Sequence, residues 1–329
     1  MTDRQAMIRQ IKAHLHDVLV DAVFPELPNF GRGKVRDHYD LSGNRRLMIT
    51  TDRQSAFDQV LAAVPFKGQV LTAAARFWFE ETADIMPNHI IEYPDPNVML
   101  AKKLSMLPVE VVVRDYLTGS TSTSIWSMYH VGNRKPYGIP LSDGMKKNDK
   151  LPQTIITPTT KGIMGEHDVP IRPDQIVEKG LLTQEQWDEI ERSAMALFTR
   201  GREVAAQHGL ILVDTKYEFG YDENGTLTIA DEIHTPDSSR YWIAESYQER
   251  IAKGEEPESL DKEFLRLWIA DRCDPYKESI PEIPDETLAD FSARYIGLYE
   301  RISGKDFEMP TGGMPVRERV RRNIQKYVE

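Results

Sequence analysis

The stretch Leu210–Asp237 constrains the fold more than any other part of the chain. Two runs rich in β-branched and aromatic residues flank Asn224-Gly225, a dipeptide typical of the two-residue type I′ turn between antiparallel strands. If these residues form the turn, counting back along both strands predicts that Glu218 lies directly opposite Asp231. The stretch begins with four apolar residues, as a central strand covered on both faces does. We therefore expect a hairpin within a buried sheet.

Two opposed carboxylates destabilise a strand pair unless a cation lies between them. Asp214 and Lys216 follow the same alternating face as Glu218. Oxygen ligands favour a hard divalent cation, so Glu218 and Asp231 are the candidate ligands of Mg²⁺ bound together with a nucleotide. The alternative is a solvated edge hairpin in which Lys216 merely offsets the acids, and the expected burial argues against it.

A zinc site is a second alternative for the acidic part of the chain. Glu166, His167, Glu232 and His234 are zinc-compatible residue types. None of them shows the tight His or Cys spacing of metalloproteases or zinc fingers. The sequence therefore favours magnesium over zinc.

A glycine turn near the N-terminus is a candidate anion site. Gly33 is followed by Lys34 and Arg36, two basic residues at alternate positions of a predicted strand. The pattern suits a cover over phosphate groups. It matches neither the P-loop nor the G-x-G-x-x-G motif, so an ordinary turn with basic neighbours is the alternative.

A second candidate anion site follows the apolar run Val109–Val113. Arg114 ends this predicted strand, and Thr118-Gly119-Ser120 comes directly after it. A guanidinium, a hydroxyl and glycine-exposed amides can converge on a phosphate. The alternative is an ordinary exit from a strand into a loop.

Two further arginines are candidates for the same kind of site. Arg240 follows a turn-like Pro236-Asp237-Ser238-Ser239, and Arg266 lies on a predicted helix that Ser259 would cap. Each of them could equally be a solvated surface residue.

The order of the predicted elements indicates an α+β fold rather than a regular βαβ series. The expected elements are an N-terminal helix from Ile8 through Leu19, a hairpin over residues 34–51, a helix at 70–84, an irregular segment at 130–162 and a helix from Thr183 towards Gly209. We expect two domains, residues 1–104 and residues 105–329.

Composition excludes several classes of function. The chain has 329 residues, 41 basic and 52 acidic, for a net charge of −11, so no overall positive field attracts nucleic acid. No apolar run is long enough to span a membrane, and charged residues interrupt the first 20 positions, so no signal peptide is expected. The single cysteine, Cys273, cannot form an internal disulfide. We expect a cytoplasmic protein with neither nucleic-acid nor membrane partners.

Two long motifs resemble the SAICAR synthetase (phosphoribosylaminoimidazole-succinocarboxamide synthase) family. They are LPVEVVVR at residues 107–114, continuing to Ser120, and LVDTKYEFG at residues 212–220. Shorter similarities extend over roughly residues 30–270. The resemblance implies an α+β fold related to the ATP-grasp and kinase-like folds. A nucleotide cleft would lie between a smaller β-rich N-terminal part and a larger α+β C-terminal part.

The resemblance also implies an activity. ATP would drive the ligation of L-aspartate to the carboxylate of carboxyaminoimidazole ribonucleotide, giving the succinocarboxamide (SAICAR), ADP and phosphate in purine biosynthesis. Phosphorylation of the substrate carboxylate would create a leaving group, and the aspartate amine would then displace it. The cofactors would be ATP and Mg²⁺, the partners small-molecule substrates, and the protein a monomer or homodimer.

Residue roles follow from the same resemblance. The ribonucleotide phosphate would be bound by Arg114, Ser120, Arg240 and Arg266. Lys161 and His167 would be further substrate-binding residues that, with Asp168, close over the substrates or help to place aspartate. The nucleotide would be bound by Gly33, Lys34, Arg36, Lys103, Glu218 and Asp231, the last two through Mg²⁺, and Lys216, Asp214 and Asp168 would be catalytic.

Two other functions fit part of the pattern. A small-molecule kinase of the inositol-phosphate type would explain Asp214 and Lys216 but not the second phosphate site at Arg114. A nucleotide-binding regulator without catalysis would not need Lys34, Lys216, Glu218 and Asp231 together. Aspartate-dependent product formation separates the ligase from both.

Overall fold

The computed structural model describes residues 4–57, 59–121, 123–161, 169–310 and 313–328. The chain divides into two compact units. The first comprises Met1–Glu80, His89–Lys103 and Leu260–Glu329, and the second comprises Glu81–Asn88 and Leu104–Ser259. Helix accounts for 36% and strand for 26%, which confirms the α+β class.

The predicted division at residues 104 and 105 coincides with one boundary between the units. Residues from Leu260 onward were expected in the second domain, but the structure groups them with the first unit. The physical reason is packing, because Leu265, Phe291 and Ile296 share a buried cluster with Met7 and Val70. As a division into functional domains, the two ranges stay a prediction.

The first unit is built on an antiparallel sheet in the order β1-β2-β3-β7-β6, beside the two-stranded β4-β5. Its elements are α1 (Arg4–Ala13), β1 (Phe30–Arg32), β2 (Arg36–Leu41), β3 (Arg45–Thr50), β4 (Arg53–Ala56), β5 (Gln59–Ala63), α2 (Lys67–Glu81), β6 (Ile90–Asp95), β7 (Val98–Lys102), α7 (Glu263–Ala270), α8 (Asp285–Ser303), α9 (Val316–Ile324) and the 3₁₀ turn η2 (Gln325–Tyr327).

The second unit is built on an antiparallel sheet in the order β11-β10-β8-β12-β13, with β9 paired to β8 and β14 paired to β12. Its elements are β8 (Ser105–Tyr116), α3 (Ile125–His130), η1 (Pro136–Gly138), β9 (Lys150–Ile156), β10 (Thr159–Thr160), β11 (Val169–Pro170), α4 (Pro173–Glu178), α5 (Gln184–Gln207), β12 (Leu210–Tyr221), β13 (Leu227–Ala230), β14 (Ser239–Ile243) and α6 (Ala244–Lys253).

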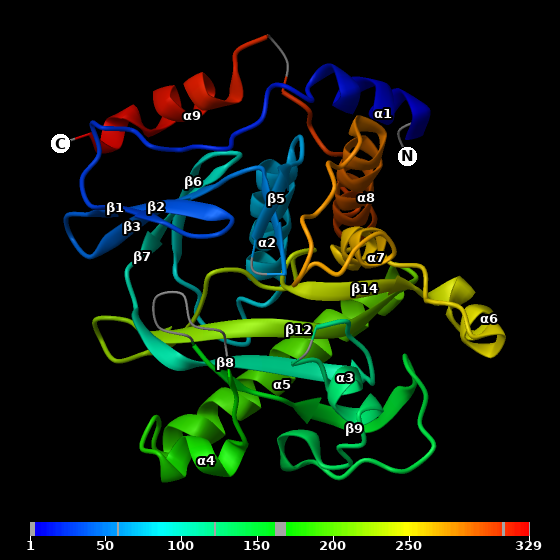
Figure 1. Ribbon diagram of the computed structural model, residues 1–329. Coiled ribbons are helices and arrows are strands. Elements are labelled where there is room, and N and C mark those ends of the chain that lie inside the picture. Colours follow the sequence, from blue (N-terminus) through cyan, green and yellow to red (C-terminus); the bar gives the residue numbers. More distant parts are fainter. Residues whose placement is uncertain (1–3, 58, 122, 162–168, 311–312, 329) are drawn as a thin grey trace. The chain divides into compact units, whose positions relative to one another are not determined.

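Helix α5 lies along the sheet of the second unit, against β12 and β8 (Figure 1). It begins as predicted, with a capping box between Thr183 and Gln186. Gly201 permits the close approach, because a Cβ at this position would come within 2.4 Å of the His234 ring and 2.7 Å of Leu212. The helix therefore covers the face of the sheet opposite to the polar rows described below.

The predicted register of the Leu210–Asp237 hairpin is wrong by one residue. Tyr221 pairs with Leu227 and Glu218 with Ala230, so residues 222–226 form the loop. The side chain of Asp222 causes the longer loop, because its Oδ1 accepts the N–H groups of Asn224 (3.0 Å) and Thr226 (2.9 Å). Asp231 consequently lies beyond β13 and has a positive φ of 61°.

Other predicted elements also differ from the structure. The helix expected at 70–84 spans Lys67–Glu81. The N-terminal helix ends at Ala13 rather than near Leu19, because the Leu19 N–H is bound by the buried Asp52 carboxylate (2.7 Å). Ser259 does not cap the following helix; it forms a β-bridge with Trp242, and the N-cap of α7 is Lys262. The segment at 130–162 contains the strand β9, which the sequence pattern did not indicate.

No helix in the ranges that the structure describes is long and apolar enough to cross a membrane.

Candidate active site

A row of three charged residues crosses three neighbouring strands of the second unit. In the strand registers, Asp214 of β12 lies directly between Arg114 of β8 and Arg240 of β14. Asp214 Oδ2 accepts Nη1 of Arg114 at 2.8 Å and Nη1 of Arg240 at 2.5 Å. Antiparallel pairing thus brings together residues that are 100 and 26 positions apart.

The row is buried and carries a net positive charge. Asp214 is 3% exposed and Arg114 is 8% exposed. Arg114 Nε also donates to Thr157 Oγ1 at 2.8 Å, which orients the guanidinium. Two guanidinium groups held by one carboxylate leave one positive charge and several N–H donors for an anion. The structure therefore brings Arg114, Asp214 and Arg240 together.

The loop after β8 lies against this row. Gly119 has a φ of 116°, and a Cβ there would come within 2.4 Å of Ser124 and 3.4 Å of Nη2 of Arg240. Only glycine fits such a close approach of backbone to guanidinium. The Ser120 hydroxyl oxygen is buried and has no hydrogen-bond partner among the described residues. A buried hydroxyl of this kind is suited to a ligand.

A second row, two positions farther along β12, contains a lysine between carboxylates. Lys216 Nζ pairs with Glu218 at 2.5 Å and with Glu110 of β8 at 2.9 Å. Glu218 and Glu110 face each other across the two strands. The expected pair of opposed acids therefore exists, but the partner of Glu218 is Glu110 and not Asp231.

Charge dominates the ionisation of this row. Burial alone would lower the pKa of Lys216, but Glu218, Glu110 and Asp231 raise it well above its usual value. Burial likewise opposes ionisation of Glu218, but Lys216 and Lys161 hold its pKa well below its usual range. Lys216 and Glu218 are therefore both charged at neutral pH.

Lys161 and Asp231 belong to the same neighbourhood. Lys161 forms an ion pair with Glu218 Oε2. The charge of Asp231 acts on Lys216, although Asp231 is not paired with Glu218 in the sheet. The predicted site residues His167 and Asp168 lie outside the described residues. No group of three or more His, Cys, Asp or Glu among the residues with described positions could hold a metal ion alone.

The glycine turn of the first unit is held from within by Arg53. Arg53 is 7% exposed and donates to the carbonyl oxygens of Gly33 (2.9 Å) and Lys34 (3.1 Å). It is fixed in turn by the fully buried Asp37, to which Nη2 donates at 2.8 Å and Nη1 at 3.2 Å. Because a peptide N–H points opposite to its carbonyl, the N–H groups that follow these carbonyls point away from Arg53. The turn therefore has the polarity of an anion-binding loop.

The other predicted site residues of the first unit have these positions. Arg36 begins β2, and Lys34 is exposed in the turn. Lys103 pairs with Asp40 at 2.7 Å. Arg266 lies on α7 and pairs with Glu263 at 3.3 Å. It belongs to the first unit, whereas Arg114 belongs to the second.

Sequence reasoning missed two residues of these sites. Glu110 had a signal, because it is a carboxylate inside an apolar run and lies on the same strand face as Arg114. Arg53 had none. Its link to the turn at Gly33 spans 20 positions and depends on the folding of the sheet.

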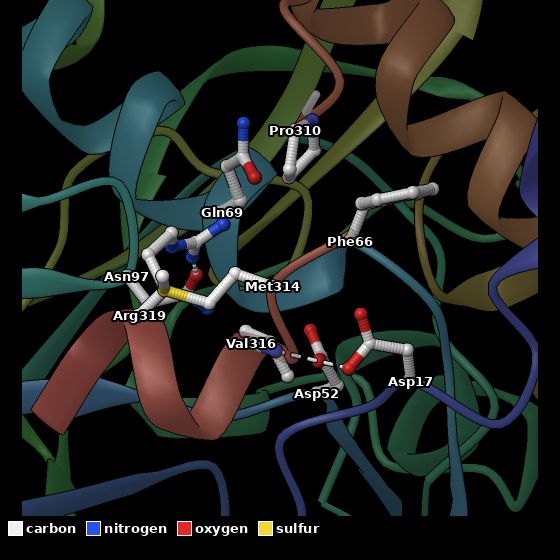
Figure 2. Close-up of a pocket in the computed structure, with 9 residues that line it drawn as sticks. All are labelled: Asp17, Asp52, Phe66, Gln69, Asn97, Pro310, Met314, Val316 and Arg319. Carbon is white, nitrogen blue, oxygen red and sulfur yellow. Dashed lines mark hydrogen bonds between the residues drawn. The ribbon is translucent and has the colours of Figure 1, made fainter. Parts of the chain in front are cut away.

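A small hollow in the first unit has none of the candidate site residues in its lining (Figure 2). Asp17, Asp52, Gln69, Asn97 and Arg319 are its polar lining residues. Asp17 accepts the Val316 N–H at 2.9 Å, and Arg319 donates to Asn97. Its volume is about 20 Å³, which suits a water molecule rather than a substrate.

Comparison with known proteins gives one family. The family model described as SAICAR synthetase matches residues 29–283. The phosphoribosylaminoimidazole-succinocarboxamide synthase of Legionella pneumophila (strain Paris) is 55% identical over 298 residues, covering 90% of this chain and 95% of its own length.

Two solved structures are also similar. SAICAR synthase from Saccharomyces cerevisiae, complexed with SAICAR, has a TM-score of 0.76 at 30% identity, covering 88% of this chain and 100% of its own. A SAICAR synthetase in complex with ADP has a TM-score of 0.65 at 26% identity, covering 85% of this chain and 100% of its own. The family match spans both the glycine turn and the charged rows. The chain belongs to the SAICAR synthetase family.

Proposed function

We propose that this protein joins L-aspartate to the carboxylate of carboxyaminoimidazole ribonucleotide at the expense of ATP, giving SAICAR, ADP and phosphate in purine biosynthesis. The similar structures that hold SAICAR and ADP support both ligand classes. The observation that carries the proposal is the row Arg114–Asp214–Arg240 next to Lys216. The cluster of anion-binding groups at the end of β8 suits a phosphorylated substrate, and the dependence of product formation on aspartate separates the ligase from a kinase.

The ribonucleotide phosphate is assigned to Arg114, Ser120 and Arg240, and a role of Arg266 stays a prediction from the resemblance. Asp214 orients both arginines of the row through its two ion pairs. This orientation costs no rearrangement when the phosphate arrives, because the guanidinium groups are already fixed. Lys216 and Asp214 are assigned to the side of the reacting carboxylate.

Lys216 neutralises negative charge in the phosphoryl transfer. Its raised pKa keeps it protonated throughout. A protonated Lys216 serves as an electrostatic group rather than a general base. From the resemblance alone, Lys161, His167 and Asp168 are assigned to the substrates.

Gly33, Lys34 and Arg36 are assigned to binding of the ATP phosphates. Lys103 is assigned to binding of the nucleotide. Glu218 and Asp231 fit Mg²⁺ in the donors they provide, since carboxylate oxygens complemented by phosphate oxygens and water are its usual ligands. When bound, Mg²⁺ would neutralise charge on the transferred phosphoryl group. Glu218 and Asp231 would hold it.

The first experiment measures ADP release from ATP, Mg²⁺ and carboxyaminoimidazole ribonucleotide, with and without L-aspartate, followed by mass analysis of the nucleotide product. Formation of the succinocarboxamide only with aspartate supports the ligase. ADP formed at the same rate without aspartate would identify a kinase. Absence of turnover would identify a nucleotide-binding regulator.

Substitution of the acidic residues tests the metal assignment. Glu218→Gln and Asp231→Asn should each abolish Mg²⁺-dependent turnover while the protein stays folded, since each removes one carboxylate from the charged group. Glu223→Gln is the matched control, because Glu223 is exposed in the hairpin loop. Wild-type rates in both site variants would refute the assignment.

A cytoplasmic location and a monomeric or dimeric state complete the proposal. Both rest on the charge pattern and the family, and gel filtration with light scattering measures the second.

A further inference from the structure

Two groups assigned to the ribonucleotide phosphate come from different parts of the second unit. Ser120 lies in the loop after β8, and Arg240 lies on β14. These two strands pair with opposite sides of β12. The loop comes close to Arg240 at Gly119, where a Cβ would lie 3.4 Å from Nη2. A phosphate bound by both groups is bound best if the loop has a fixed position relative to β14 beforehand.

The backbone of Asn148 lies against the start of this loop. Asn148 is 3% exposed, and its φ of 68° lies in the left-handed region that asparagine adopts more readily than most residues. Its N–H donates to the Leu117 carbonyl oxygen at 2.8 Å, and the Leu117 N–H donates to the Asp149 carbonyl oxygen at 2.8 Å. This pair of hydrogen bonds fixes Leu117, directly before Thr118.

The side-chain amide of Asn148 is hydrogen-bonded at both ends. Its Nδ2 donates to Glu256 Oε2 at 2.9 Å, and Glu256 also pairs with Lys147 at 2.5 Å. Because a carboxylate only accepts, the amide oxygen points the other way and accepts the Thr118 hydroxyl at 2.6 Å. A hydroxyl has one hydrogen, so Thr118 cannot also donate to a phosphate. Thr118 therefore anchors the loop, and Ser120 supplies its hydroxyl to the ligand.

Asn148 is connected in turn to the part of the chain that follows β14. Helix α6 begins directly after this strand, and the Tyr247 hydroxyl of α6 donates to the Asn148 carbonyl oxygen at 2.8 Å. The Tyr247 ring stacks on Trp242 of β14, with ring centroids 5.4 Å apart. Glu256 lies shortly after α6. Asn148 thus joins the loop after β8 to the strand and helix that follow Arg240 in the chain.

We propose that Asn148 is a positioning residue of the ribonucleotide phosphate site. Its amide oxygen fixes Thr118 and with it the backbone of Gly119 and Ser120, while its carbonyl oxygen and amide nitrogen are bound by groups that follow β14. Ser120 and Arg240 are thereby placed for one phosphate monoester before it binds. Asn148 lies outside the two family motifs. The inference rests on the proposed function, because the phosphate belongs to the ribonucleotide.

Asn148→Gly tests the side chain alone. Glycine adopts a φ of 68° without strain and keeps both backbone hydrogen bonds, so only the amide is lost. Asn29→Gly is the matched control, because Asn29 has a φ of 51° and its Nδ2 donates to the Asp40 carbonyl oxygen at 3.1 Å, but it belongs to the first unit. Thr118→Val removes the other partner of the same hydrogen bond, and Thr118→Ser keeps the hydroxyl.

Titration calorimetry of the full chain with SAICAR, and separately with ADP, measures the two affinities. Steady-state kinetics gives kcat and the KM for carboxyaminoimidazole ribonucleotide, and thermal melts check folding. Asn148→Gly should bind SAICAR about tenfold more weakly than wild type and raise this KM by a similar factor, with little change in kcat or ADP affinity, because the buried Thr118 hydroxyl loses its partner and the loop is no longer fixed.

Thr118→Val should show a similar loss of SAICAR affinity. The double variant should lose no more than the weaker single variant, because both substitutions remove one hydrogen bond. Thr118→Ser and Asn29→Gly should keep wild-type affinities. If Asn148→Gly does not fold, Thr118→Val compared with Thr118→Ser tests the same hydrogen bond.

Three results would overturn the inference: wild-type SAICAR affinity in Asn148→Gly or in Thr118→Val, equal losses of SAICAR and ADP affinity, or additive losses in the double variant. A purely structural role of Asn148 would lower the folded fraction and kcat and leave the ribonucleotide KM unchanged. Failure of the wild-type protein to form SAICAR would instead overturn the proposed function, so the two failures are distinguishable.

Discussion

At the scale of single residues, Lys216 is the group whose removal has the clearest consequence. Its ammonium lies between Glu110 and Glu218, which face each other across β8 and β12. Without it, two carboxylates of low exposure would lose their shared partner. Such an uncompensated charge is more costly than the ion pair is stabilising.

Lys216→Met should lower the free energy of unfolding by about 2–3 kcal/mol at pH 7, somewhat less than is typical for a fully buried pair, because the Lys216 side chain is 31% exposed. The loss should be smaller at pH 5, where protonation of a carboxylate relieves the repulsion. Urea unfolding at both pH values measures it. Lys179→Met, at an exposed position, is the control, and addition of Glu110→Gln should restore part of the loss.

Asp52 gives the pH dependence at the same scale. Burial raises its pKa to about 6, against the lowering effect of hydrogen bonds from Leu19 and Gly68. An unfolded Asp titrates near pH 4. Between about pH 4 and 6 the folded state therefore binds more protons than the unfolded state, and stability falls as the pH rises.

The free energy of unfolding of the wild type, relative to that of Asp52→Asn, should fall by at most about 3 kcal/mol between pH 4 and pH 7. The stability that Asp52 contributes is fully present below about pH 4 and is lost as the pH rises past about 6. Urea titrations of both proteins over this range measure it, with Asp306→Asn, at an exposed position, as the control. A difference that does not vary with pH would contradict the raised pKa.

At the scale of elements, the strand registers decide which charges meet. Arg114, Asp214 and Arg240 form a row only because β8, β12 and β14 pair with these residues side by side. The loop after β8 must then approach Arg240 closely, and Gly119 makes that possible.

Gly119→Ala and Gly225→Ala separate conformational strain from steric blockage. Both glycines have positive φ, but a Cβ at Gly225 meets no atom within 4 Å, whereas at Gly119 it meets Ser124 at 2.4 Å. Gly225→Ala should cost about 1 kcal/mol of stability and leave SAICAR affinity unchanged. Gly119→Ala should weaken SAICAR binding by more than about tenfold, measured by calorimetry, because the loop must move away from Arg240. Equal affinities in the two variants would contradict this.

At the scale of the whole chain, residues outside the family match complete the core of the first unit. Helix α9 places Val320 and Ile324 in the buried cluster with Leu47 and Val98 of the sheet. Arg319 pairs with the buried Asp95, at 3.1 and 3.2 Å. The last part of the chain is therefore part of the domain core, and the first unit depends on distant segments of the chain (Figure 1).

Ile324→Ala should lower the free energy of unfolding of the first unit by about 3 kcal/mol, since Ile324 is 2% exposed and its removal leaves a cavity. Arg322→Ala, two residues before Ile324 and on the opposite, exposed face of the helix, should change it by less than about 0.5 kcal/mol. Urea unfolding followed by Trp fluorescence measures both. Equally small effects of the two substitutions would show that α9 does not contribute to the hydrophobic core.

Elements with strong local signals were predicted well. The capping box at Thr183, the turn at Gly43 and Asn44, and the start of β12 at Leu210 all follow from residues close together in sequence. The hairpin register failed because Asp222 hydrogen-bonds the loop backbone and lengthens the loop. The difference of one residue places Ala230 instead of Asp231 opposite Glu218 on β13, and Glu110 faces Glu218 from β8, on the other side of β12.

The sequence by itself determined the α+β class, the family and most of the charged residues of the site, because period-2 patterns, capping residues and long motifs are local properties of the chain. The tertiary structure alone decided that Glu110 shares Lys216 with Glu218 and that Arg53 holds the glycine turn. These contacts join residues from about 20 to more than 100 positions apart. Strand pairing and packing bring such residues together, and no local pattern encodes which partner each side chain will meet.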